Sequence, residues 1–230
     1  MPPIWTPLAR RPSAVLLTVQ FIGVLVYPFL DGVLGRMVLS AFGLVVLFIA
    51  VRTVQSTPAL TWVSVVLGVP LVILAVIEIA DPLNVPAALA SSILLAIFYG
   101  YTSYALIRYM FHDRHVTIDE LWATGATFTV VAWAFAYTFV AVEIIWPRSF
   151  AGAAPVITPQ GWFDMLFLSF TNLTSVGLSD IIPSGAHARS IVMIEQVAGL
   201  MYVALVVSRV VGLTIARQRL LEGPSARPDL

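Results

Sequence analysis

The chain alternates between long apolar stretches and short polar or proline-containing segments. A helix needs about twenty apolar residues to cross the hydrocarbon core of a bilayer. Stretches near or above that length cover residues 13–30, 34–51, 59–80, 85–111, 118–146 and 187–215. The pattern therefore predicts an all-α membrane protein with six transmembrane helices.

A further apolar stretch, residues 161–173, lies between the fifth and sixth spans and is too short to cross. Thr158 and Pro159 precede it, an order typical of a helix N-cap followed by proline at the first helical position. Turn-forming residues flank the stretch on both sides. We expect a re-entrant helix that enters and leaves on the same side of the membrane.

The spans divide into a group of four and a group of two. Residues 1–111 are predicted to form a four-helix bundle, and residues 117–215 hold the last two spans with the short helix between them. The sequence Thr-Ile-Asp-Glu at 117–120 is a capping box that opens the fifth span. Residues 112–116 form a short polar linker, and residues 216–230 are expected to be a polar tail.

Arginine positions predict the orientation in the membrane, because cytoplasmic loops carry an excess of basic residues. In the six-span arrangement one side receives Arg10, Arg11, Arg52, Arg108, Arg114, Arg209, Arg217, Arg219 and Arg227. The other side receives only Arg36, Arg148 and Arg189. Both termini are therefore expected in the cytoplasm of a multi-pass cell-membrane protein, and the short helix is expected to enter from the outside.

Composition narrows the chemistry. The chain is 60% hydrophobic and 10% charged, too little polar surface for a soluble globule. Its net charge of zero gives no reason to expect a nucleic-acid partner. Without cysteine there are no disulfides, thiolate metal sites or cysteine nucleophiles. We expect membrane lipids as surroundings and no organic cofactor.

The most informative segment follows the short helix. It reads Ser-Phe-Thr-Asn-Leu-Thr-Ser-Val-Gly-Leu-Ser-Asp-Ile-Ile-Pro over residues 169–183. Such small, hydroxylated residues do not continue an apolar helix, and irregular backbone is tolerated at membrane depth only inside protein or beside water. The C-terminal partial negative charge of the short helix favours a cation there, and backbone carbonyls can replace ion hydration.

The segment resembles the selectivity filter of the tetrameric potassium channel family, whose usual pattern is T-T-V-G-Y-G-D with a proline soon after. The matching residues are Thr174, Ser175, Val176, Gly177, Asp180 and Pro183. The last span is also similar to the inner helix of bacterial six-span members, at Arg189, Glu195, Gly199, Tyr202 and Arg209. The resemblance implies a homotetrameric ion channel, not an enzyme, with potassium bound at the carbonyls of Ser175, Val176 and Gly177.

Two adjacent positions depart from the family pattern. Leu178 replaces the usual tyrosine and Ser179 the second glycine, so a weakly selective channel for potassium and sodium is the alternative reading. We expect Leu178 to face Phe167 and Leu168 of the short helix. If Ser179 keeps the positive φ usual for that glycine, the strain costs about 1 kcal/mol or more.

Residues behind the filter are candidates for support. A carboxylate within a membrane span is costly unless paired. Glu195 is therefore expected either to brace the filter by hydrogen bonding to Thr171, Asn172 or Thr174, or to be kept protonated by burial. Gly199 is a candidate hinge, although close packing is the more frequent use of glycine in membrane helices. The apolar stripe that follows is expected to line an inner cavity and gate it by dewetting, at Leu200, Val203 and Val207.

The fourth span carries only Arg108, at its cytoplasmic end, which predicts a voltage-insensitive protein. Swapped tetramers of the resembled family need a long surface helix between the fourth and fifth spans, and residues 112–116 are too few to form one. We therefore expect each bundle to pack on its own pore helices. Functions of other classes are a carrier, which would show repeated halves, and an intramembrane hydrolase, for which the histidines fall at span ends.

Overall fold

The computed structural model describes residues 12–29, 61–81, 83–111 and 118–222. The predicted span 34–51, the linker 112–116 and the first residue of the capping box lie outside these ranges. The helices and strands are α1 (Pro12–Val26), the 3-10 helix η1 (Tyr27–Phe29), α3 (Thr61–Ala80), α4 (Val85–Met110), α5 (Ile118–Ile145), β1 (Phe150–Ala151), α6 (Pro159–Leu173), β2 (Ile182–Pro183) and α7 (Ala186–Glu222).

Most predicted elements form with nearly the expected bounds. One difference is the last helix, which continues through residues 216–222, so the expected tail begins later than residue 216. The other is the two-stranded sheet, which an all-α prediction does not contain.

Three helices of the described chain are long and apolar enough to cross a membrane: Val85–Met110, Leu121–Ile145 and Ala186–Arg209. Ser13–Phe29 and Val66–Ala80 are shorter apolar helices. The protein is therefore a helical membrane protein, and the full set of six spans remains a prediction.

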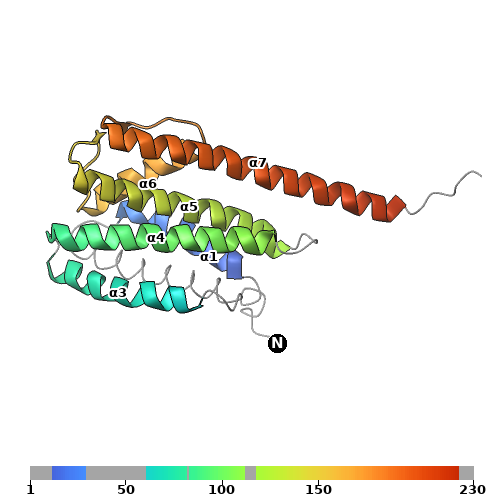
Figure 1. Cartoon of the computed structure of the whole chain (residues 1–230), viewed down its shortest axis with the longest axis horizontal. Coiled ribbons are helices and arrows are strands. Elements are labelled where there is room, and N and C mark those ends of the chain that lie inside the picture. The colour runs from blue at the N-terminus through green and yellow to red at the C-terminus, as the bar shows by residue number, and fades with distance from the viewer. Residues whose placement is uncertain (1–11, 30–60, 82, 112–117, 223–230) are drawn as a thin grey trace, which may run out of the picture.

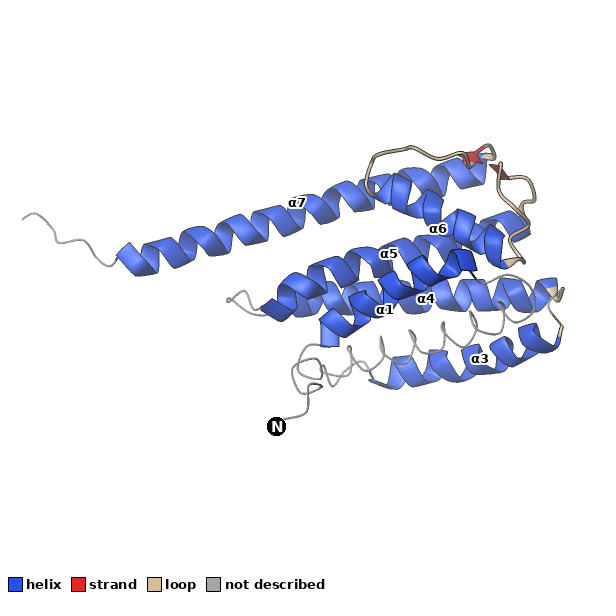
Figure 2. Cartoon of the chain, turned by 180° about the vertical axis from the view of Figure 1, so that it is seen from behind, coloured by secondary structure: helices blue, strands red, loops and turns tan. Residues whose placement is uncertain are grey.

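Helix α5 lies at the centre of the molecule, and α1, α4, α6 and α7 all pack against it (Figures 1 and 2). Helix α3 packs on α4 at the edge. Beyond its contacts with α5 and α6, α7 continues away from the other helices (Figure 1). Helix α5 thus contacts helices from the first part of the chain as well as the pair α6 and α7.

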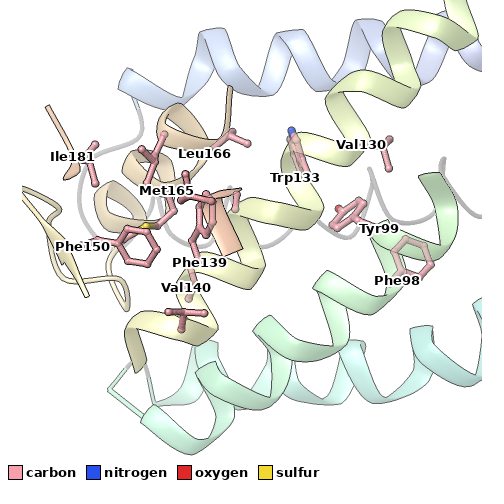
Figure 3. Close-up of a cluster of buried hydrophobic side chains, with 14 of the residues drawn as sticks. Phe98, Tyr99, Val130, Trp133, Phe139, Val140, Phe150, Met165, Leu166 and Ile181 are labelled. Atoms are coloured by element: carbon pink, nitrogen blue, oxygen red, sulfur yellow. The ribbon is translucent and has the colours of Figure 1, made fainter. Parts of the chain in front are cut away.

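The α4–α5 pairing is the most extensive helix contact in the described chain. Phe98 and Tyr99 of α4 are fully buried in the core (Figure 3). Tyr99 meets Trp133 of α5 edge-on at 5.5 Å between ring centroids, and Trp133 meets Trp162 of α6 in the same way at 5.4 Å. Such edge-to-face pairs are favourable beyond their buried area. A continuous aromatic core therefore connects the bundle to α6 within one chain.

Strands β1 and β2 bring the chain back to the end of the molecule where α5 ends. Phe150 pairs with Pro183 and Ala151 with Ile182 in antiparallel register. The Ser149 carbonyl also accepts from the amides of Ser184 and Gly185, at 2.8 and 3.0 Å. The segment between α5 and α6 and the segment between α6 and α7 are thus held together just before α7 begins.

Candidate functional site

Helix α6 begins as its sequence predicts. The Thr158 side chain caps the helix by accepting from the Gly161 amide at 3.2 Å, and Pro159 follows as the first helical residue. Gly161 lies so close to the preceding loop that an added Cβ would be 2.3 Å from the Pro155 carbonyl oxygen. Cap and glycine together fix where α6 starts.

The C-terminus of α6 is closed by the residues that follow it. The Ser175 amide donates to the Asn172 carbonyl at 2.9 Å, and the Val176 amide donates to the Thr171 carbonyl at 3.0 Å. These two bonds, with Ser175 left-handed at φ 59°, make a Schellman motif in which serine takes the position that glycine usually holds. The Gly177 amide donates to the same Thr171 carbonyl at 3.0 Å. Thr171 therefore supports the segment through its backbone, while its own hydroxyl donates to Leu168 at 2.8 Å.

Residues 174–178 are exposed in the single chain. Val176 is 60% and Leu178 75% exposed, although both are apolar. Leu168 is buried in the core and Phe167 is exposed, so the expectation that Leu178 faces both residues stays a prediction. Exposed apolar side chains that lie next to one another are typical of interaction surfaces.

Backbone strain falls on a different serine from the one expected. Ser175 has φ 59° and Gly177 has φ 68°, whereas Ser179 lies outside the left-handed region. The Ser179 hydroxyl accepts from the Ile181 amide at 3.1 Å, a local turn that explains its ordinary φ. The departure from glycine at 179 therefore carries no backbone penalty in this conformation.

The end of the segment that leads to α7 is held in place by contacts with neighbouring backbone. A Cβ added to Gly152, which has φ 89°, would lie 2.6 Å from the Asp180 carbonyl oxygen. The Arg189 side chain donates from Nε to the Pro183 carbonyl at 3.0 Å. Asp180 itself is exposed. Both contacts fix the path of the chain between the segment and α7.

The inner face of α6 is joined to α7 at two successive helical turns. Ser169 and Leu173 are four apart on α6, and Glu195 and Gly199 are four apart on α7, so each pair lies on one helix face. At the first turn the hydroxyl of Ser169 is hydrogen-bonded to Glu195 Oε1 and, at 2.8 Å, to the Ala132 carbonyl of α5. Glu195 is fully buried. This polar contact ties three helices together behind the exposed segment.

At the second turn the contact is backbone to backbone. A Cβ added to Gly199 would lie 2.1 Å from the Leu173 carbonyl oxygen and 2.9 Å from its carbon. Leu173 is the last residue of α6, and Thr174 caps it. Glycine is required at 199 because α7 touches the end of α6, which favours the close-packing reading over the hinge.

Farther along α7 lies the predicted apolar stripe. Leu200, Val203 and Val207 are all exposed in the single chain, and Val203 and Val207 also border an open hollow of about 420 Å³ lined by residues of α1, α5, α6 and α7. The Tyr202 hydroxyl crosses beside this hollow and donates to the Thr124 carbonyl of α5 at 2.6 Å. All three residues of the stripe are therefore uncovered in one chain, and their lining of an inner cavity stays a prediction.

Comparison with known proteins identifies the family. Residues 92–215, more than half of the chain, match the family model described as ion channel. The chain belongs to the ion channel family. No match was found among curated proteins or among solved structures.

The matched range of this ion channel begins in α4 and includes α5, α6, the exposed segment and most of α7. All the residue contacts described above between α5, α6 and α7 lie inside it. Within the described residues, no cluster of three or more His, Asp or Glu side chains is placed to hold a metal ion.

Sequence reasoning missed Ser169 as the partner of Glu195. Thr171, Asn172 and Thr174 were the expected candidates, yet the Thr171 and Thr174 hydroxyls turn back to their own helix, to Leu168 and Phe170. Asn172 does lie beside the carboxyl group. A helical-face argument finds Ser169, because it lies one turn before Leu173 and three residues before Asn172.

Proposed function

We propose that four copies of this chain assemble around one axis and conduct monovalent cations, with potassium preferred, through residues 174–180. The observation that carries the proposal is the capped end of α6, where the chain leaves the helix at Ser175 and runs exposed through Leu178 inside a region that belongs to the ion channel family.

The local backbone suits a row of carbonyl ligands. Left-handed φ at Ser175 and Gly177, but not at Val176, changes the sense of the chain from one residue to the next. Carbonyl groups that would alternate in a regular strand can then face the same way. The three carbonyls of residues 175–177 are the proposed potassium ligands, since oxygen rings can replace the hydration shell of an ion.

The position of α6 adds to cation binding. It is a short helix whose C-terminus lies at the start of the proposed filter, and the partial negative charge of that end attracts a cation. In this proposal α6 enters the membrane from outside and does not cross it, and β1 and β2 return the chain to the outer surface.

Assembly explains the surfaces left uncovered by one chain. Val176 and Leu178 are the apolar parts of the exposed segment, and the outward face of α7 adds Leu200 and Met201, at 67% and 58% exposure. A single strand cannot surround an ion, so the proposed filter needs several copies. Fourfold symmetry brings each Leu178 against a neighbouring chain, where packing replaces the hydrogen bond that the usual tyrosine makes in the resembled family.

The first helices form a scaffold in this proposal. Six spans, cytoplasmic termini and a location in the cell membrane follow from the sequence pattern. The intrachain α4–α5 core supports an unswapped arrangement in which each bundle packs on its own pore helices. With Arg108 as the only arginine of α4, opening is expected to depend little on voltage.

Ion flux from purified protein in liposomes tests the function, with potassium, sodium and a large organic cation compared at the same driving force. We expect potassium flux to exceed sodium flux and the organic cation to be excluded. Equal passage of all three, or no flux from correctly folded protein, would overturn the proposal. Mass measurement of the same preparation in nanodiscs should give four chains.

A further inference from the structure

The hydrogen bonds at Ser169 contain one more acceptor than a serine can satisfy alone. Its hydroxyl oxygen lies 2.8 Å from the Ala132 carbonyl and within hydrogen-bonding distance of Glu195 Oε1. A serine hydroxyl has one hydrogen to donate, and a backbone carbonyl only accepts. If Glu195 were ionised, one of these oxygen–oxygen contacts would have no hydrogen between its atoms.

We infer that Glu195 carries a proton and donates it to Ser169, which in turn donates to the Ala132 carbonyl. Each of the two oxygen–oxygen contacts then contains one hydrogen. Glu195 donates to Ser169, and Ser169 donates to the Ala132 carbonyl of α5. The relay crosses from α7 through α6 to α5, so the position of α6 depends on a titratable hydrogen bond.

The rest of the carboxyl group agrees with a neutral acid. Glu195 Oε2 and the neighbouring Asn172 Nδ2 are both buried, and although Asn172 is the one donor beside Ser169 that reaches the carboxyl group, the two atoms make no hydrogen bond of ordinary distance and angle, nor does either find another partner among the described residues. An ionised carboxylate normally gathers several donors, and leaving it buried without them is very costly. A protonated carboxyl group leaves at most weak acceptors unsatisfied.

No charged group faces Glu195 from the described parts of the helices packed on it. On α6, Asp164 accepts from the Ala154 amide at 2.8 Å near the helix start. On α5, Glu143 accepts from the amides of Arg148 and Phe150, at 2.7 and 3.0 Å, near the helix end. On α7 itself, two such groups lie in the first turn: His187 stacks on the Trp146 ring, and Arg189 donates to the Pro183 carbonyl. Arg209 lies over the Phe111 ring, far along the helix from Glu195. The other titratable group on this stretch of α7, Tyr202, donates to Thr124.

Conduction through the proposed filter should depend on whether Glu195 is protonated. Ser169 is one turn before Leu173, where α6 touches Gly199, and the Schellman motif that begins the exposed segment follows at once. Removing the proton from Glu195 places a bare carboxylate against Ser169 and breaks the relay. We expect the seating of α6 on α7 to loosen and conduction to fall as the pH rises. This functional consequence rests on the proposed channel activity, whereas the protonation itself does not.

Infrared spectroscopy of the full-length protein in lipid tests the protonation directly. The wild-type protein at neutral pH should show the carbonyl stretching band of a buried carboxylic acid, and Glu195→Gln should remove the part of the band that Glu195 contributes. The Ser91 hydroxyl likewise contacts both Glu78 Oε1 and, at 3.1 Å, the Ala88 carbonyl, so Glu78 is a second source of such a band and the two spectra are compared as a difference. The matched control is Glu143→Gln, which also removes a carboxyl group from a membrane helix. Glu143 accepts hydrogen bonds from two backbone amides, as an ionised carboxylate does, so this change should leave the band unaltered. Absence of the band from the wild type, or a band of unchanged intensity in Glu195→Gln, would overturn the inference.

Flux measurements then test the role of the proton. Glutamine is neutral and can donate to Ser169, so Glu195→Gln should keep flux within about twofold of wild type at neutral pH and lose the alkaline decline. Ser169→Ala should lower flux several-fold at every pH. A Glu195→Gln channel that still declines with rising pH would refute the proton dependence. If the infrared result holds and no variant or wild type conducts potassium, the proposed function fails and the protonation stands.

Discussion

Substituting Gly199 by alanine tests how closely the proposed filter depends on the α6–α7 contact. The added methyl would lie 2.1 Å from the Leu173 carbonyl oxygen, and carbon–oxygen contacts are favourable only near 3.5 Å. The neighbour is backbone and cannot rotate away. Helix α7 must therefore move from the end of α6 by about 1.4 Å to restore a favourable contact. Overpacking of this kind costs about 1–3 kcal/mol.

The overpacking cost applies only when α7 is in contact with the end of α6. It does not apply when the two helices have separated. If conduction requires contact between α6 and α7, raising the free energy of that state by about 1–3 kcal/mol lowers the conducting population by about 5- to 150-fold. Potassium flux should fall accordingly, and the thermal unfolding midpoint should fall with it. Gly212→Ala is the matched control, because it lies on the same helix and its added Cβ meets nothing within 4 Å.

Helix propensity alone predicts the opposite result. Alanine is favoured over glycine inside a helix by about 0.5–1 kcal/mol, so Gly212→Ala should be neutral or slightly stabilising. A hinge at 199 would predict altered opening with unchanged or raised thermal stability. If Gly199→Ala is as stable as Gly212→Ala, the close approach of α7 to the Leu173 carbonyl is not the reason that glycine is needed at position 199.

Three further changes test the filter and the packing of the bundle. Ser175→Gly should raise the unfolding midpoint by relieving a left-handed serine, a gain of about 1 kcal/mol, whereas Ser179→Gly should not; equal effects in thermal unfolding would contradict the assigned backbone. Leu178→Tyr combined with Ser179→Gly should raise the potassium-to-sodium permeability ratio measured by reversal potentials, and an unchanged ratio would show that these positions do not set selectivity. Because the chain has no cysteine and the Thr127 hydroxyl contacts Met110 Sδ at 3.6 Å, Met110→Cys with Thr127→Cys should crosslink within one chain on a denaturing gel. Crosslinks only between chains would contradict the unswapped arrangement.

The start of α6 could be predicted because its signals are local. Thr158 and Pro159 are adjacent in the sequence and act on the first turn of the helix, and the structure uses both. Membrane-length helices were likewise visible in the apolar runs at α4, α5 and α7. Such features depend on a few consecutive residues and on the length of the bilayer.

Contacts between distant segments were less predictable. Ser169 and Ala132 come together only because α5 and α6 pack side by side, and nothing in either local sequence marks the pair. Ser179 was expected to carry strain by analogy with glycine, yet a hydrogen bond two residues away lets it adopt an ordinary φ. The β1–β2 pairing is two residues per strand, too short to produce an alternating pattern.

The structure of the protein in a lipid nanodisc with potassium present tests the central claim most directly. The account predicts four chains around one axis, α7 innermost, and ion density on the axis beside the carbonyls of Ser175, Val176 and Gly177. The density should weaken when potassium is replaced by a large organic cation. A monomer or dimer that conducts, or a tetramer whose residues 174–180 lie away from the axis, would contradict it.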